Sequence, residues 1–187
     1  PKARTYLEAL DRLGQVLLKQ NLCQEAAEVL KERVTGCPSP PARLLYGSLL
    51  QKLGRRQEAI EQYSRLPNWE RDRHYNLASA YWQEGNHEEA LIQLLRGFTW
   101  GVEPAHALER IQQGKTPLYG GEYWQHYGGL WDEPGRQFVL AIAAQPWVRR
   151  RLRIVREQGT RVRSLISTSS RVWLLQRGLK AAGVVPG

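Results

Sequence analysis

The chain has 187 residues, enough for one domain or for one array of small units with a real core. Its longest unbroken apolar run, residues 138–144, is far shorter than the roughly 20 residues that cross a bilayer, so we expect no transmembrane helix. Residues 1–104 hold 14 Lys and Arg against 13 Asp and Glu, and residues 105–187 hold 13 against 5, so the second half carries nearly all of the net charge of +9. This asymmetry predicts an acidic partner there, which is nucleic acid, an anionic membrane face or an acidic protein.

Three stretches in the first hundred residues share one skeleton of large and small residues. They begin at Leu10, Arg43 and His74. In each stretch a small residue is followed 12 positions later by an alanine, with a polar turn between the two. The pairs are Gly14 with Ala26, Gly47 with Ala59, and Ala78 with Ala90. This spacing predicts three antiparallel helix pairs, because small residues let paired helices approach and large residues fill the gaps between them.

The three copies resemble the tetratricopeptide repeat family over about residues 5–100. The resemblance implies an all-α fold, a right-handed superhelical array of antiparallel helix pairs with a C-terminal helical cap. We expect three hairpins in residues 1–103, a linker helix and a degenerate fourth hairpin in residues 104–145, and basic capping helices in residues 146–187. The alternative is an ordinary helical bundle in which the spacing is coincidental.

A stretch rich in aromatic residues and glycines, YGGEYWQHYGG at residues 119–129, follows the three copies. If residues 121–131 are helical, its tyrosines line up on one face, and residues 134–144 supply a second helix. We interpret the rings as packing residues of the fourth hairpin, with a short linker helix over residues 104–113. A ligand-gripping loop is the alternative, and the glycines favour it, since each costs roughly 1 kcal/mol in a helix interior.

Arginines recur in a helix that we expect between Pro146 and Gly159. Its apolar stripe contains Val148, and the opposite side is basic. The basic face consists of Arg149, Arg150, Arg153 and Arg156. These arginines either contact the acidic partner or form a solvated helix face. A last helix over residues 171–182 is expected to end at Gly183.

No catalytic constellation, cofactor motif or metal-ligand spacing is visible, so we expect no catalytic residues, no cofactor, no metal and no small-molecule substrate. "GKT" at residues 114–116 lacks the earlier glycine of a phosphate-binding loop, and the four histidines are scattered as packing or surface residues. The pair Asp132 and Glu133 is expected to cap a helix. Cys23 and Cys37 stand at opposite ends of a predicted helix, roughly 20 Å apart, so they cannot form a disulfide with each other.

In tetratricopeptide proteins the first helix of each pair lines a concave groove, so the resemblance implies a groove here. Its expected residues are Asp11, Arg12, Gln15 and Lys19 in the first copy, Leu44, Leu45, Ser48 and Lys52 in the second, and Asp72, Tyr75, Asn76, Ser79 and Trp82 in the third. One class of the family clamps acidic chaperone tails with a Lys, Asn, Asn, Lys, Arg set. Aspartates replace both lysines here, so we expect no chaperone-tail binding. Leucine and aromatic anchors instead suit a helix or an extended peptide.

The sequence therefore predicts a non-enzymatic adaptor or assembly factor that holds a protein partner in this groove. The alternatives are a nucleic-acid-binding protein and an anionic-membrane-surface binder, both of which use the arginine-rich C-terminal half. The unpaired cysteines favour a reducing compartment such as the cytoplasm. The chain begins at Pro1 and contains no methionine, so a processed N-terminus stays open.

Overall fold

The computed structural model describes residues 4–68, 71–100, 132–146, 148–150, 177–178 and 180–181. The chain divides into two compact units, residues 1–73 and 74–187. Every regular element in these ranges is a helix, and none of the described residues lies in a strand. The all-α class expected from the sequence is confirmed.

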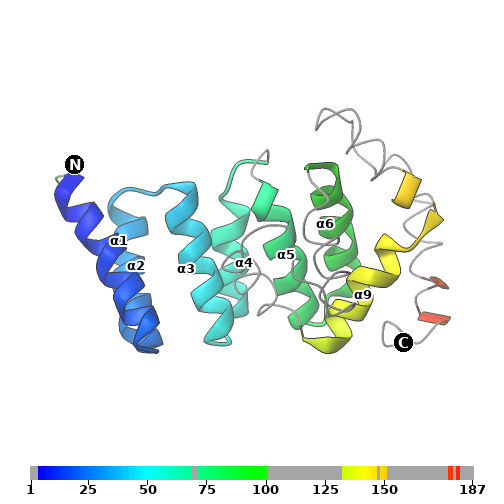
Figure 1. Ribbon diagram of the computed structural model, residues 1–187, viewed down its shortest axis with the longest axis horizontal. Coiled ribbons are helices and arrows are strands. Elements are labelled where there is room, and N and C mark those ends of the chain that lie inside the picture. Colours follow the sequence, from blue (N-terminus) through cyan, green and yellow to red (C-terminus); the bar gives the residue numbers. More distant parts are fainter. Residues whose placement is uncertain are drawn as a thin grey trace. The chain divides into compact units, whose positions relative to one another are not determined.

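The first unit contains two helix pairs joined by short turns. They are α1 (Arg4–Lys19) with α2 (Cys23–Gly36) and α3 (Pro40–Lys52) with α4 (Arg56–Ser64), and the members of each pair lie side by side in Figure 1. Helix α2 also packs against α3, so the first pair is stacked on the second. This is the arrangement that the repeated sequence predicts, since one pair cannot bury its apolar faces alone.

The turn within each pair is closed by one residue in the left-handed region of backbone space. Asn21 has φ 61°, Gly54 has φ 77° and Gly85 has φ 78°. Glycine and asparagine adopt this conformation at little cost, and it ends a helix by redirecting the chain. These three residues recur at the same spacing as the helix pairs, so each pair has the same kind of turn between its two helices.

The small residues of the skeleton lie where paired helices touch. A Cβ atom on Gly14 would lie 2.9 Å from Cδ2 of Leu30, and one on Gly47 would lie 2.5 Å from Cε1 of Tyr63. Both distances are shorter than packed carbons allow, so a larger residue at either position would force the facing side chain to move. The four alanines of the skeleton are completely buried: Ala26, Ala59, Ala78 and Ala90. The predicted register of the helix pairs is therefore confirmed.

The second unit contains the third pair, most of α5 (Arg71–Gln83) with α6 (His87–Trp100), and also α9 (Glu133–Ala143). Asp132 caps α9, because its side chain accepts a hydrogen bond from the backbone nitrogen of Gly135 at 2.8 Å. The helix expected over residues 134–144 and its acidic cap are confirmed. Pro146 and residues 148–150 are helical, as are residues 177, 178, 180 and 181 of the expected last helix.

Several other predictions fall outside the described residues. They are the linker helix at 104–113, the aromatic-rich helix at 121–131 and most of the C-terminal cap. The helix predicted between the two cysteines is present, since Cys23 begins α2 and Cys37 follows its last residue.

Candidate functional site

The predicted groove residues of α1 and α3 combine exposed polar ends with half-buried leucines. Arg12, Gln15 and Lys19 are exposed on α1, and Lys52 is exposed at the end of α3. Leu44 and Leu45 are half-buried. A surface of this kind offers apolar contact area next to donors that stay in water, which suits a peptide with mixed side chains.

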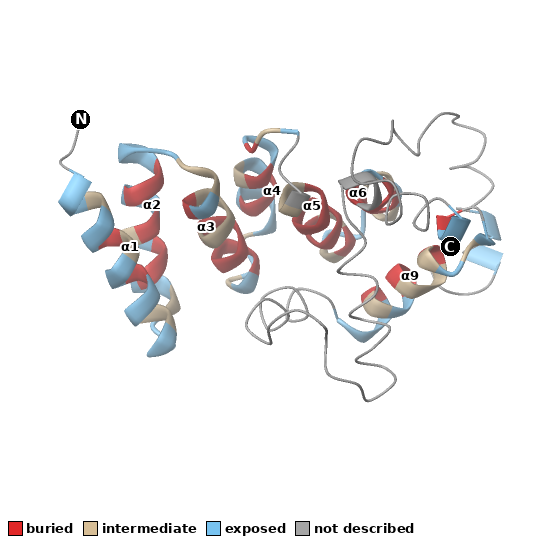
Figure 2. Ribbon diagram, turned by 45° about the horizontal axis from the view of Figure 1, so that its top comes forward, coloured by how far each residue is buried: buried red, intermediate tan, exposed pale blue. Residues whose placement is uncertain are grey.

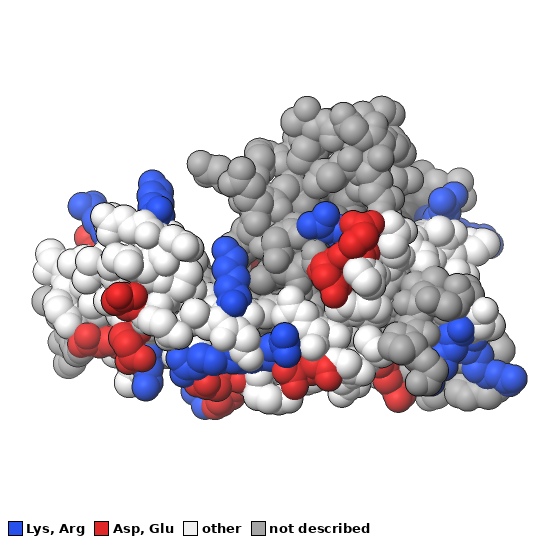
Figure 3. Space-filling model, turned by 90° about the horizontal axis from the view of Figure 1, so that it is seen from below, with Lys and Arg blue, Asp and Glu red and all other residues white. Residues whose placement is uncertain are grey.

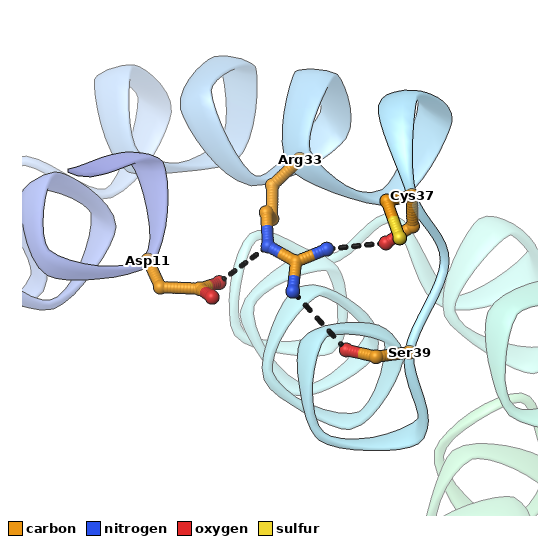
Figure 4. A network of polar contacts seen from close by, with 4 residues as sticks. All are labelled: Asp11, Arg33, Cys37 and Ser39. Atoms are coloured by element: carbon orange, nitrogen blue, oxygen red, sulfur yellow. Dashed lines mark hydrogen bonds and ion pairs between the residues drawn. The ribbon is translucent and has the colours of Figure 1, made fainter. Parts of the chain in front are cut away.

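Asp11, which was also predicted to line the groove, forms an ion pair within the chain (Figure 4). Its Oδ1 lies 2.9 Å from Nε of Arg33 on α2, as an ion pair in which the N–H is not aimed at the oxygen. Nη1 of Arg33 donates to the carbonyl oxygen of Cys37, and Nη2 donates to Oγ of Ser39 at 3.4 Å. Arg33 is only 8% exposed, so one buried cation joins α1, the end of α2 and the turn that leads to α3.

Arg33 was not among the predicted site residues, although its position in the sequence marks it as unusual. Arg33 lies seven positions after Ala26 and three after Leu30, on the apolar side of α2. A charged residue on that side needs a partner, since an unpaired buried charge is costly. Asp11, 22 positions earlier, is that partner.

Two polar residues of α3 point into the first unit rather than toward solvent. Ser48 is 3% exposed, and its hydroxyl donates to the carbonyl oxygen of Leu45 at 3.0 Å. Its neighbour Gln51 accepts a hydrogen bond from the hydroxyl of Tyr63 at 3.2 Å, and burial raises the pKa of Tyr63. Ser48 therefore lies in the core, where the groove prediction had expected an exposed side chain.

The aromatic anchors predicted on α5 are also buried. Tyr75 is 2% exposed and packs on Gly97 of α6, where a Cβ atom would lie 3.1 Å from Cε1 of the tyrosine. Trp82 is 6% exposed, and its Nε1 donates to Oδ1 of Asp132 at 2.9 Å. The indole also stacks on Phe138 of α9, with ring centroids 4.6 Å apart. The exposure assumed for both rings is not observed, because later parts of the chain cover them; a binding role for them stays a prediction.

The remaining predicted residues of α5 differ in burial. Asp72 is half-buried, and Ser79 and Asn76 are completely buried. Neither the oxygen nor the nitrogen of the Asn76 amide has a hydrogen-bond partner among the described residues.

The two described histidines are packing residues, as predicted. His74 is 5% exposed, and its Nδ1 lies 2.9 Å from Oε1 of Gln93. His87 packs against Trp82 with ring centroids 4.5 Å apart. Burial, followed by the charge of Lys180, lowers the pKa of His87, so its neutral form is favoured.

Only part of the predicted basic face can be placed. Arg149 and Arg150 are exposed on helical residues next to the buried Val148, whereas Arg153 and Arg156 lie outside the described residues. Elsewhere, Figure 3 shows basic and acidic side chains next to one another on the face it presents. At the two ends of α4, for example, Arg65 just after the helix pairs with Glu61, and Arg55 just before it pairs with Glu58 at 2.7 Å.

The described parts of the chain contain no group of three or more His, Cys, Asp or Glu side chains that could hold a metal ion. None of their helices has the length and apolar character needed to cross a membrane. The candidate contact sites in these parts are therefore the surface on α1 and α3 and the two exposed arginines after α9.

Comparison with known families gives one match. Residues 72–100, which include all of α5 except Arg71 and the whole of α6, match the model of the tetratricopeptide repeat. No curated protein matches the chain. Tetratricopeptide repeats are generally non-catalytic scaffolds, and domains built from them typically bind protein partners.

Proposed function

We propose that this protein is a non-enzymatic adaptor that holds a helix or an extended peptide of a partner protein, because residues 72–100 match the model of the tetratricopeptide repeat. The repeat match is the observation that carries the proposal. The contact surface that we assign in the first unit is the groove face, defined as Arg12, Gln15, Lys19, Leu44, Leu45 and Lys52.

The assignment of the groove face as a contact surface is supported by the exposure of its side chains. Its polar members are exposed, and its two leucines keep part of their surface open to solvent. Apolar anchors surrounded by polar side chains match the usual anatomy of a peptide-binding surface, with a few central contacts inside a hydrated rim. Asp11 and Ser48 are left out because each is held by contacts within the chain.

A random peptide library selected against the intact chain tests this proposal. We expect selected peptides to bind the double variant Leu44→Ala/Leu45→Ala at least about tenfold more weakly, which corresponds to about 1.4 kcal/mol. Lys31→Ala is the matched control, because Lys31 is exposed on α2 and lies outside the groove face. Circular dichroism checks that the variants stay helical. Failure to enrich any peptide, or equal loss of affinity in the control, would contradict the proposal.

Nucleic-acid binding is the second candidate, and the observation that favours it is the exposure of Arg149 and Arg150 in the strongly basic half of the chain. If the basic face contacts phosphates, affinity for an arbitrary DNA or RNA falls steeply with salt. Changing Arg149, Arg150, Arg153 and Arg156 to Gln is then expected to reduce the logarithmic salt slope by roughly 3. Fluorescence anisotropy at several salt concentrations measures it. An unchanged slope would remove this candidate.

A further inference from the structure

The connection from α2 to α3 carries a serine that is followed by two prolines. Residues 37–41 read Cys-Pro-Ser-Pro-Pro, and none of the three prolines has a backbone N–H to donate. Ser39 precedes α3 in extended backbone, with φ −125° and ψ 151°. Figure 2 shows the connection as exposed or half-buried, and Ser39 itself is half-buried. A short extended segment of this kind can enter the cleft of a modifying enzyme while losing few backbone hydrogen bonds.

Ser39 occupies the N-cap position of α3, yet its hydroxyl makes no capping hydrogen bond. A serine at this position usually accepts a hydrogen bond from the second or third backbone N–H of its helix. Here Pro40 and Pro41 begin the helix and have no N–H groups to donate. The positive end of the α3 dipole therefore lacks the side-chain acceptor that usually caps it, and this end favours negative charge.

A buried cation lies beside the serine hydroxyl (Figure 4). The Arg33 side chain is 10% exposed, and its Nη2 donates to Oγ of Ser39 at 3.4 Å. This distance is long for a hydrogen bond, whose donor and acceptor usually lie about 2.9 Å apart. The carboxylate of Asp11 lies near Nε, but that N–H is not aimed at it. Arg33 therefore brings positive charge to Ser39 without a well-aligned hydrogen bond to a carboxylate of the described residues.

These two features together fit a phosphate group on Oγ of Ser39. A phosphoserine carries a charge of about −1.5 to −2 at neutral pH and has three acceptor oxygens. Its oxygens would lie at the N-terminus of α3 and next to the guanidinium that already points there. Both neighbours favour an anion, so the modification orders this connection and does not melt it. Because Arg33 belongs to α2, the phosphate would tie the first helix pair to the second.

We propose that Ser39 is a phosphorylation site for a proline-directed protein kinase, an enzyme class that selects serine or threonine followed by proline. The phosphate is then held by Arg33 and the N-terminus of α3. In the transfer, Oγ of Ser39 forms a bond to the γ-phosphorus of ATP, the bond from that phosphorus to its bridging oxygen breaks, and ADP leaves. The hydroxyl proton passes to the catalytic aspartate of the kinase. The modification does not depend on the adaptor role proposed above.

A purified kinase of this class, incubated with ATP and the intact chain, tests the site directly. Thr116 is the other serine or threonine followed by proline in the sequence, so the test uses the Thr116→Ala background. Intact mass and peptide fragmentation are expected to show one phosphate, on Ser39. Pro40→Ala is the matched control, which keeps the serine and removes the proline, and it should lower incorporation at least about tenfold. Absence of phosphate from Ser39, or equal incorporation in the control, would overturn the proposal.

The binding site for the phosphate is tested by phosphorus NMR on intact chains with phosphoserine installed at position 39 or, as the control, at position 64. Ser64 is exposed and ends α4, where the helix dipole disfavours an anion. The second pKa of a phosphoserine is ordinarily about 6, and we expect a value at least about 0.5 lower at position 39 than at position 64.

Two variants then identify the cation that causes the difference. Asp11→Asn should lower the pKa of phosphoserine 39 further, because Arg33 is then left to the phosphate. Arg33→Gln should raise this pKa, with circular dichroism as the check that the variant is folded. Equal pKa values at positions 39 and 64 would contradict the proposed site, whether or not the groove face binds a peptide.

Discussion

Replacing Tyr63 with alanine is expected to lower the free energy of unfolding by about 3 to 5 kcal/mol, the usual cost of removing a buried aromatic side chain. Tyr63 is 0% exposed on α4, and its hydroxyl donates to Gln51 of α3. The ring also fills the space that Gly47 leaves open. Thermal and denaturant unfolding followed by circular dichroism measure the loss.

The matching change on α3 tests the same contact from the other side. Gly47→Ala places a methyl group 2.5 Å from the Tyr63 ring, so overpacking is expected to cost about 1 to 3 kcal/mol. Tyr63→Leu removes the ring edge, and in that background Gly47→Ala should cost clearly less. Gly178→Ala is the control, because an added Cβ at this helical glycine would meet no side chain or neighbouring element within 4 Å. The free energy of unfolding of this variant should stay equal or rise by up to about 1 kcal/mol. Additive effects at Gly47 and Tyr63 would show that the helices do not meet there.

Trp82→Ala is expected to destabilise the second unit by about 3 to 5 kcal/mol. The side chain stacks on Phe138 and donates a hydrogen bond to Asp132, so it ties α5 to the start of α9. Trp82→Phe should keep the stacking and lose the hydrogen bond, at a cost of about 1 to 2 kcal/mol. The measurement is thermal unfolding of the three proteins.

The Trp82 series also distinguishes the two roles assigned to this residue. A core residue lowers the melting temperature when it is truncated, whereas a surface anchor lowers only partner affinity. Unchanged melting of Trp82→Ala would contradict its placement against α9 and favour the original prediction of a groove anchor.

Local spacing was sufficient to predict the helix pairs. The contacts of Gly14 with Leu30 and of Gly47 with Tyr63 follow from a small and a large residue at fixed intervals, and the connecting turns are short. Because a pair of adjacent helices is a local structure, its register can be predicted from about 30 residues of sequence. The cap at Asp132 was predictable for the same reason, since a capping residue acts on its own helix.

Exposure in the groove could not be predicted in this way. Whether Trp82 faces solvent depends on Asp132 and Phe138, which are 50 and more positions later in the chain. The burial of Tyr75 depends on its contact with Gly97, a residue that the repeat pattern does not include. The groove positions of a repeat are assigned by analogy with other repeats, and later segments of this chain change which of those positions are open.

Hydrogen–deuterium exchange of the intact chain, with and without a library-selected peptide, is the most direct test of the adaptor proposal. A peptide held on the groove face should slow exchange in α1 and α3, which carry that face, more than in α2 and α4. The control peptide has the same composition in scrambled order and should leave all four helices unchanged. Slowed exchange confined to α2 and α4, or to residues 148–150 beside the basic face, would contradict the adaptor account.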